Sequence, residues 1–333
     1  MLAYFIELRR TVCTFVVRKS PVKLVLMGGL GNQLFQLAFG VYISTTTGKS
    51  VLLQDSNRSI RRTSTGEPEI MLYNTDFTLE KSKSEIYGNL ADRGLGLLLR
   101  LNLESKLGCL KFPAIALVKW LLSFLSSAYY QTLMTVFAAG DIGFTSWAPS
   151  RFSQIIIGYF QTYKYLNQPH VLKVMKSLVP RSGESEVESY KELLLKESPL
   201  LVHIRLGDYR NEPKIGILPP SYYHDAITEQ MNSDLYNIIW VFSDEISEYK
   251  SYIPEQFHGN VRLIQSVGTN SVSLLEVMRM CKGYVIANST LSWWAASLSL
   301  SEGAPVSYPD PWFESMPTPR DLINPNWKAV LRK

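Results

Sequence analysis

Short apolar runs alternate with amphipathic stretches throughout the second half of the chain. The apolar runs have the length of buried strands and lie at 200–204, 237–242, 261–264 and 284–287. The stretches between them have helical periodicity and lie at 221–231, 246–252 and 271–281. Regular alternation of this kind predicts right-handed crossovers and a parallel, doubly wound sheet, so we expect an α/β fold.

The first half contains the same kind of unit, repeated less regularly. A strand at 22–27 leads through a glycine-rich turn, Gly28 to Gln33, into a stretch with helical periodicity. A second strand is predicted at 155–160 and a second helix at 171–179. Polar turns with short strands are expected over residues 50–92.

Two segments raise the question of a membrane. Residues 1–20 are basic, and their apolar runs are too short for a signal peptide or a span. Residues 120–140 carry no charge, but serine, threonine and glutamine dilute their hydrophobicity and disfavour a span. This second run predicts one or two helices buried in the first domain. The alternative is that residues 1–20 and 112–140 rest on a membrane surface.

Length and composition limit the class of protein. A chain of 333 residues exceeds the usual limit of one hydrophobic core, and an apolar content of 46% is ample for two. The linker-like segment at 180–185 places the boundary between a domain at 21–185 and a domain at 186–333, and residues 1–20 are expected to form an extension before the first domain. A net charge of +5 is too diffuse to indicate nucleic acid binding. The three cysteines are widely spaced, which indicates neither a disulfide framework nor a zinc site and favours a reducing compartment.

Polar residues follow three of the predicted strands of the second half. They are Arg205 and Asp208 after the first, Ser243 and Asp244 after the second, and Asn288, Ser289, Thr290 and Ser292 after the fourth. Each group alone is also explained by turns and helix caps. In an open α/β sheet, however, ligands bind where the carboxyl ends of the strands meet. An Arg fork and a helix start together suit a phosphate, so the pattern predicts a nucleotide site.

The glycine-rich turn of the first half lacks the familiar nucleotide signatures. A dinucleotide fingerprint needs glycine where this chain has Leu34, and a Walker A loop needs Gly-Lys-Ser/Thr. The turn still permits close approach of a ligand to the backbone, although a tight strand-to-helix turn is the simpler explanation.

Four motifs together resemble the α-1,2-fucosyltransferases of glycosyltransferase family 11. They are Gly28 to Gln36, His203 to Tyr209, Val241 to Asp244 and Asn288 to Trp294, and their order and spacing match from about residue 22 to the C-terminus. The segments Gly158 to Gln161 and Pro309 to Phe313 are also similar. The resemblance implies a GT-B fold with two Rossmann-like domains that face a cleft. It also implies a GDP-fucose donor, inversion, an α-1,2 linkage to a β-galactoside, and no metal or other cofactor.

The resemblance also assigns roles to residues. Arg205 is expected at the diphosphate, with Ser289, Thr290 and Ser292 beside it, and Asp244 near the nucleoside. Gly31 and Asn32 are expected at the donor's sugar, and His203 is expected to orient the turn or the donor. Gly29, Gln33, Ser243 and Asn288 complete the predicted donor site. The chain departs from the family where Leu206 replaces a second Arg, which puts a two-Arg diphosphate clamp in doubt, and where Glu245 replaces an Asp.

Direct displacement requires a base that takes the proton of the acceptor hydroxyl. Asp208 and Glu212 are the two candidates, and Asp208 can instead brace Arg205. A different nucleotide-sugar donor and a non-catalytic GDP-sugar-binding module are the alternative functions. The expected acceptor is an O-antigen or capsule repeat, carried on a lipid. We therefore expect a cytoplasmic protein that can associate with the inner membrane at its periphery.

Overall fold

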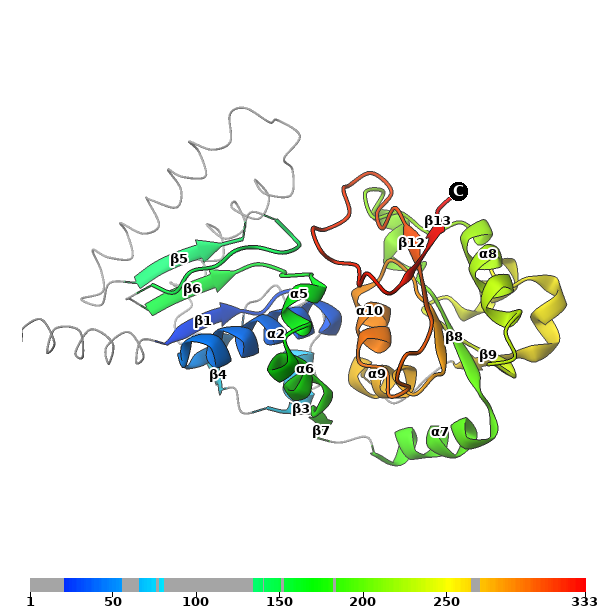
Figure 1. The fold of residues 1–333 in the computed structure, drawn as a ribbon, viewed down its shortest axis with the longest axis horizontal. Coiled ribbons are helices and arrows are strands. Elements are labelled where there is room, and N and C mark those ends of the chain that lie inside the picture. Colours follow the sequence, from blue (N-terminus) through cyan, green and yellow to red (C-terminus); the bar gives the residue numbers. More distant parts are fainter. Residues whose placement is uncertain are drawn as a thin grey trace, which may run out of the picture.

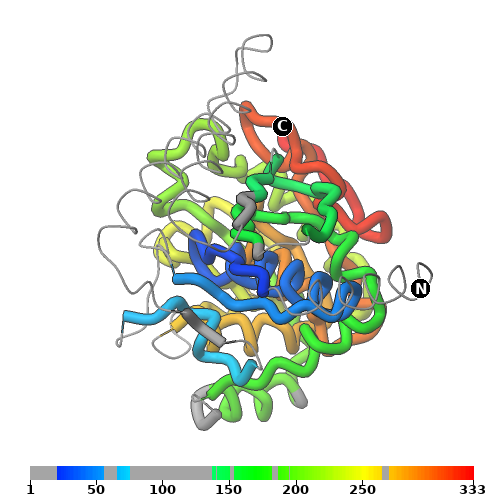
Figure 2. Tube along the Cα trace, turned by 90° about the vertical axis from the view of Figure 1, so that its left-hand side faces the viewer, coloured from blue at the N-terminus to red at the C-terminus, as the bar shows by residue number. Residues whose placement is uncertain are grey.

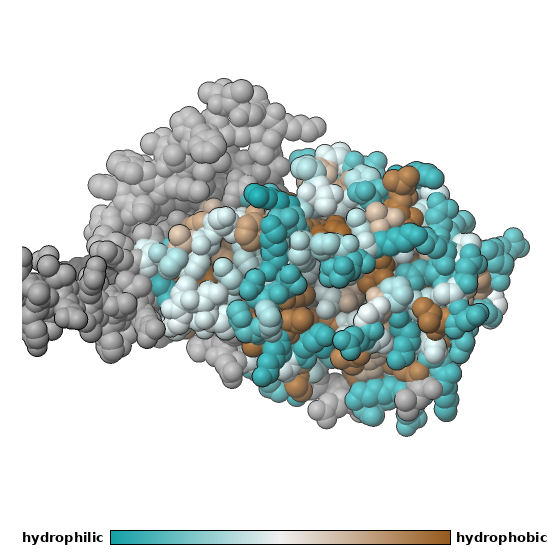
Figure 3. All heavy atoms as spheres, in the orientation of Figure 1, coloured by the Kyte–Doolittle hydropathy of each residue, from teal (hydrophilic) through white to brown (hydrophobic). Residues whose placement is uncertain are grey.

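Two parallel sheets dominate the structure, one in each half of the chain. The computed structural model describes residues 21–55, 66–75, 78–80, 134–139, 141–150, 153–181, 184–264 and 270–333. The two halves lie side by side in Figure 1, and Figure 2 views the molecule with the N-terminal half in front. On the face drawn in Figure 3, hydrophilic side chains surround small, separate hydrophobic patches.

The N-terminal sheet has the order β4-β2-β1-β6-β5, and all of its neighbours are parallel. Its strands are β1 (Val22–Val25), β2 (Val51–Gln54), β4 (Thr78–Glu80), β5 (Met134–Ala138) and β6 (Ser153–Ile157). The predicted helices over 120–140 are therefore wrong for residues 134–138, which form a strand because β6 offers them a parallel partner. The rest of that segment and residues 1–20 lie outside the described part of the chain.

The C-terminal sheet has the order β10-β9-β8-β11-β12-β13, and its neighbours are also parallel. Its strands are β8 (Pro199–Ile204), β9 (Ile238–Ser243), β10 (Val261–Ile264), β11 (Gly283–Val285), β12 (Val306–Asp310) and β13 (Lys328–Leu331). The first four match the predicted strands, and the last two were missed. The strand order reverses between β8 and β11, which is where open sheets of this type bind their ligands.

Helices cover both sheets. They are α2 (Leu30–Thr47), α5 (Tyr163–Leu166), α6 (Pro169–Lys176), α7 (Glu184–Lys196), α8 (Pro220–Met231), α9 (Ser271–Met278) and α10 (Thr290–Ser297). The described residues also form the 3-10 turns η1 (Glu69–Leu72), η2 (Asp208–Asn211), η3 (Ile246–Ser251) and η4 (Glu255–Asn260). A small antiparallel sheet pairs β3 (Tyr73–Asn74) with β7 (Val179–Pro180). The predicted helix at 246–252 is thus a 3-10 turn.

The core follows directly from the sequence of these elements. Every residue of β8 is buried, as expected of a strand covered on both faces. Helix α2 has no charged residue and is buried on most of its surface, so it can pack between the two halves. In Figure 1, α2, α5 and α6 lie on the side of the N-terminal half that faces α9 and α10. One hydrophobic cluster accordingly contains residues of both halves, among them Leu34 and Trp294.

Candidate active site

Arg205 lies at the carboxyl end of β8, beside the point where the strand order reverses. Its Nη2 is 2.8 Å from Asp208 Oδ1, and its Nε is 3.3 Å from Asp244 Oδ2. Burial acts to lower the pKa of Arg205, but the two carboxylates outweigh it and raise the pKa above its ordinary value. Only 19% of the side chain is exposed. The structure therefore presents a permanently charged, oriented guanidinium at the ligand-binding edge of the sheet.

Asp244, which follows β9, shapes the turn that carries this Arg. Its Oδ1 accepts a hydrogen bond of 2.9 Å from the N–H of Leu206, while its Oδ2 faces Arg205. Gly207 passes so close that an added Cβ would lie 2.9 Å from Oδ2. Both oxygens of Asp244 thus stabilise the turn, and the expected contact with a nucleoside stays a prediction. The neighbouring Ser243 accepts a hydrogen bond from the N–H of Glu245 through its hydroxyl.

Leu206 does not face the ligand-binding edge. It is 1% exposed and belongs to the core cluster that also contains Ile204 and Leu218. An Arg in this backbone conformation would be buried among apolar side chains, at a high free-energy cost. Arg205 is therefore the cation that the turn after β8 offers.

The turn after β11 supplies a helix start with its backbone donors. Ser289 is the N-cap of α10, and its hydroxyl accepts a hydrogen bond from the N–H of Leu291. Ser292 is fully buried and donates its hydroxyl to carbonyls of the same turn. Asn288 is 2% exposed, and its Nδ2 donates to the carbonyls of residues 215 and 216. Its Oδ1 is buried without a hydrogen-bond partner, and such groups usually mark a site that a ligand or water completes.

Tyr209 joins these two turns. Its hydroxyl donates to the carbonyl oxygen of Asn288 at 3.1 Å, and its ring lies 5.6 Å from the guanidinium of Arg205. Burial raises the pKa of Tyr209 to about 12, so the phenol stays protonated as a donor. Tyr209 was not among the site residues predicted from the sequence, although it directly follows the predicted site residue Asp208.

His203 is a buried, neutral imidazole. It is 4% exposed, and burial, aided by the nearby charge of Arg205, lowers its pKa to about 3. Its Nδ1 has no hydrogen-bond partner, and its carbonyl oxygen accepts from the hydroxyl of Tyr223 at 3.1 Å. An imidazole with such a low pKa stays uncharged at neutral pH. This fits the expected orienting role of His203 and disfavours a role as a catalytic acid.

The start of α2 meets the start of α10. Gly31 lies so close to Thr290 that an added Cβ would be 2.4 Å from its Oγ1. The indole Nε1 of Trp294 donates to the carbonyl of Gly31 at 2.8 Å. Two helix N-termini, each with a partial positive charge, therefore converge near Arg205. Repulsion between them favours an anionic ligand at this place.

The other residues of the glycine-rich turn have distinct environments. Gly28 has a φ of 72°, a left-handed conformation that glycine adopts without strain. Gly29 is the N-cap of α2 and is half-buried. Gln33 is fully buried and connects the carbonyl of Gly28 with the N–H of Ile70, which accounts for its presence on structural grounds. Asn32 is half-buried, and its Oδ1 accepts from Gln161 Nε2 at 2.9 Å.

The two candidate bases differ in their partners. Asp208 is 62% exposed but is paired with Arg205. Glu212 is exposed, and its carboxylate has no partner within the described ranges. The turn behind it is firmly held, because the carbonyl of Ile215 accepts from both Asn288 Nδ2 and Arg332 Nη1. Asp208 thus braces Arg205, and Glu212 is available for proton transfer.

The described residues contain no group of three or more His, Cys, Asp or Glu side chains arranged to hold a metal ion. None of the helices described is long and apolar enough to cross a membrane.

Comparison with known proteins shows which family the C-terminal half matches. The model of glycosyl transferase family 11 matches residues 172–330, which include the turns after β8, β9 and β11. An α-1,2-colitosyltransferase of Escherichia coli is 28% identical over 300 residues, or 87% of this chain and 91% of that protein. These matches support a glycosyltransferase of family 11.

Two further similarities concern part of the chain and the fold. The O-antigen biosynthesis glycosyltransferase WbnK of Escherichia coli is 31% identical over 134 residues, which are 39% of this chain and 44% of WbnK. The crystal structure of the α-1,6-fucosyltransferase NodZ of Bradyrhizobium, soaked with GDP-fucose, superposes with a TM-score of 0.51 at 11% identity. That match covers 84% of this chain and 93% of NodZ. The expected GT-B fold is confirmed.

Proposed function

We propose that this family-11 glycosyltransferase transfers L-fucose, with inversion, from GDP-β-L-fucose to the 2-hydroxyl of a terminal β-galactoside. One observation carries the proposal. Arg205 and the start of α10 lie together at the strand-order reversal of the C-terminal sheet, and the start of α2 faces them. A nucleoside diphosphate has the charge and the shape that this arrangement favours.

The leaving group explains why these groups matter. Cleavage of the donor's glycosidic bond places negative charge on the diphosphate, and fixed cations and N–H donors stabilise that charge in the transition state. Arg205 is oriented before the donor binds, because Asp244 holds its turn. Neither ion pair of Arg205 uses its Nη1, so a phosphate oxygen can bind there while Asp208 stays in place. We propose that these groups allow transfer without a metal.

We propose that Glu212, the second of the two candidates, removes the proton. Inversion needs a base on the face of the sugar opposite GDP, and the carboxylate must be free to accept the proton. Asp208 is engaged by Arg205, whereas Glu212 extends from the adjacent loop without a partner among the described residues. Asp208 then acts through Arg205, as a brace for donor binding.

A donor that carries colitose is the second candidate. It is favoured by the α-1,2-colitosyltransferase, which is similar over nearly its full length. Colitose lacks one hydroxyl of fucose, so a change of few contacts separates the two donors. The relative named for O-antigen biosynthesis supports a surface polysaccharide as the natural acceptor in either case.

The decisive experiment is transfer by the purified protein from GDP-fucose to lactose, with EDTA present and the product linkage determined. We expect an α-1,2-fucosylated product. Arg205→Ala should abolish transfer and weaken GDP binding, and Glu212→Gln should abolish transfer while GDP still binds. Full activity of Arg205→Ala would contradict the proposed site. Transfer from a colitose donor alone would establish the second candidate, and GDP binding without any turnover would indicate a binding module.

A further inference from the structure

In the N-terminal sheet, the first strand in chain order, β1, and the last, β6, are parallel neighbours. The segments that leave these two strands at their carboxyl ends carry Asn32 and Gln161. Residues 24–48 and 153–163 contain no charged side chain, in contrast to the turn after β8 with its Arg and Asp residues. An uncharged polar surface suits a neutral, hydroxyl-rich group, such as the sugar of a nucleotide-sugar donor.

Gln161 is placed by a strained backbone. Phe160, immediately before it, has a φ of 54°, which is a costly conformation for an aromatic residue. The Phe160 ring stacks on Phe39 at 4.0 Å, and it leaves no room for a Cβ at Gly158. Strain of this size persists where the surrounding packing imposes it, and it is concentrated at functional sites. Here it directs the following residue toward α2.

The contact between the two carboxamides has a definite polarity. Gln161 Nε2 donates to Asn32 Oδ1 at 2.9 Å. The acceptor end of Asn32 is therefore occupied, and its Nδ2 donors remain for a ligand. Gln161 is 7% exposed, and its Oε1 is buried without a hydrogen-bond partner. A buried oxygen left in this state lowers stability, and a ligand hydroxyl or a water would offset that cost.

The pair lies beside the meeting point of the two halves. Asn32 follows Gly31, which contacts Thr290 at the start of α10. A diphosphate held by Arg205 and α10 would thus direct its sugar toward the uncharged surface around Asn32.

We propose that Gln161 is a positioning residue for the transferred sugar: it fixes Asn32 so that the Nδ2 end, and not the oxygen, faces a sugar hydroxyl. This inference rests on the proposed function. It adds a further residue of the N-terminal half to the proposed donor site.

Titration calorimetry with GDP and with GDP-fucose tests the inference. Gln161→Leu releases Asn32, and Gln161→Glu, of nearly the same shape, forces Asn32 to turn its Nδ2 toward the new carboxylate. We expect each variant to bind GDP within about twofold of the wild type but GDP-fucose at least about tenfold more weakly, the value for one lost hydrogen bond. A purely structural role predicts instead that the similarly shaped Glu is well tolerated.

Gln154→Leu is the matched control, because Gln154 is also a buried glutamine but lies near the start of β6, whereas Gln161 follows the end of that strand. The side chain of Gln154 accepts a hydrogen bond from the N–H of Ser150. It should leave the ratio of the two affinities unchanged. Wild-type affinity of Gln161→Glu for GDP-fucose, or an equal loss of GDP and GDP-fucose binding, would overturn the inference. Equal wild-type affinities for the two nucleotides would do so as well. A wild-type protein that binds neither nucleotide would contradict the proposed function instead.

Discussion

At the scale of single residues, the site combines one fixed cation with buried polar groups that lack partners. Arg205 is oriented by two carboxylates, while His203 Nδ1, Asn288 Oδ1 and Gln161 Oε1 are buried without hydrogen bonds. Most buried polar groups in proteins are paired, so the unpaired atom on each of these three residues is informative. They are best explained by a ligand or ordered water that completes the site.

His203 should make the protein sensitive to acid. Its pKa is about 3 in the folded chain, because of burial and then Arg205, whereas an unfolded imidazole titrates near about 6.5. At a pH between these two pKa values, the imidazole is protonated in the unfolded chain but not in the folded one. The free energy of unfolding therefore falls as the pH falls through this range, and above it the residue adds no pH dependence. From pH 7 to pH 5 we expect a loss on the order of 2 kcal/mol from this residue.

Urea unfolding at both pH values measures that loss. His203→Asn should remove it, whatever its effect on stability at pH 7. His170→Asn, at an exposed position, is the control and should leave the pH difference unchanged. An unchanged pH difference in His203→Asn would show that the imidazole is not held neutral.

At the scale of elements, the packing of α2 against α10 sets the geometry of the site. Phe35 of α2 lies between Trp293 and Trp294, with ring centroids at 4.5 and 4.8 Å. Gly31 allows the two helix starts to approach within backbone contact. Aromatic packing of this kind fixes the relative position of two elements, so the two N-termini are held next to each other.

Gly31→Ala should therefore destabilise the protein. Alanine favours a helix over glycine by about 1 kcal/mol, but here its Cβ would lie 2.7 Å from a backbone carbon of Thr290. Backbone atoms cannot move aside easily, so overpacking at about 1–3 kcal/mol should exceed that gain. Denaturant unfolding measures the balance. Gly259→Ala, where nothing lies within 4 Å of the added Cβ, should stay within about 0.5 kcal/mol. A stabilised Gly31→Ala would contradict the close contact.

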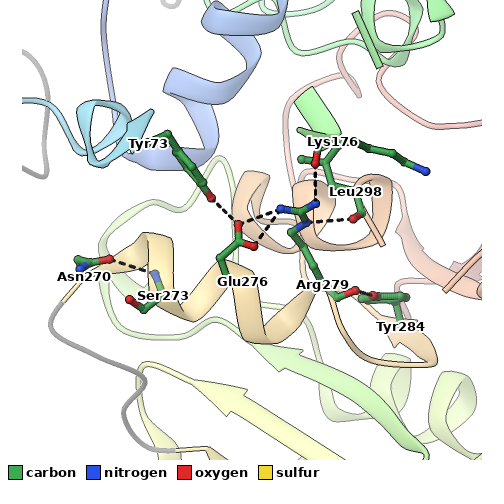
Figure 4. Close-up of polar contacts among 8 residues, drawn as sticks. All are labelled: Tyr73, Lys176, Asn270, Ser273, Glu276, Arg279, Tyr284 and Leu298. Atoms are coloured by element: carbon green, nitrogen blue, oxygen red, sulfur yellow. Dashed lines mark hydrogen bonds and ion pairs between the residues drawn. The ribbon is translucent and has the colours of Figure 1, made fainter. Parts of the chain in front are cut away.

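At the scale of the whole molecule, the two halves are joined by buried polar contacts as well as by the shared core. In Figure 4, two residues of the N-terminal half contact the pair formed by Glu276 of α9 and its C-cap residue Arg279. The hydroxyl of Tyr73 donates to Glu276, and the backbone carbonyl of Lys176 accepts from Arg279. Arg279 is 4% exposed, contacts both oxygens of Glu276, and donates to the carbonyl of Leu298. Burial, and then Glu276, raise the pKa of Tyr73 well above its usual range, so its hydroxyl remains a donor.

A second set of contacts joins the halves near the end of β6. The backbone of Phe144 donates to the carbonyl of Arg320, and Thr162 Oγ1 donates to the carbonyl of Asp321 at 2.7 Å. Lys164 pairs with the Asp321 carboxylate at 2.8 Å. With contacts at two places and a continuous core between them, we expect the halves to unfold together.

Glu276→Ala tests this interface. The change leaves Arg279 charged and buried without its partner, and removal of one member of a buried pair typically costs about 3–5 kcal/mol. Tryptophan fluorescence and circular dichroism should report one coincident unfolding transition at lower denaturant. Glu188→Ala, in an exposed pair with Lys191, should cost at most about 1 kcal/mol. Separate transitions for the two signals would contradict cooperative unfolding of the halves.

Local patterns predicted much of the C-terminal half. Apolar runs between helical stretches identified β8, β9, β10 and β11, because a parallel strand buried on both faces must be apolar along its whole length. The same patterns missed β12 and β13, whose sequences contain proline, serine and lysine. They also failed for β5, because an uncharged apolar run fits a buried helix as well as a strand.

The sequence by itself determined the fold class, the family and the residues at the strand ends, since these depend on periodicity and on motifs that are local in the chain. Only the tertiary structure decided how those residues are used. It turned Leu206 into the core, engaged Asp208 with Arg205, and paired Asn32 with Gln161 across 129 residues. Such roles depend on which groups meet in space and on which are buried. These properties arise from packing between distant segments, which no local pattern specifies.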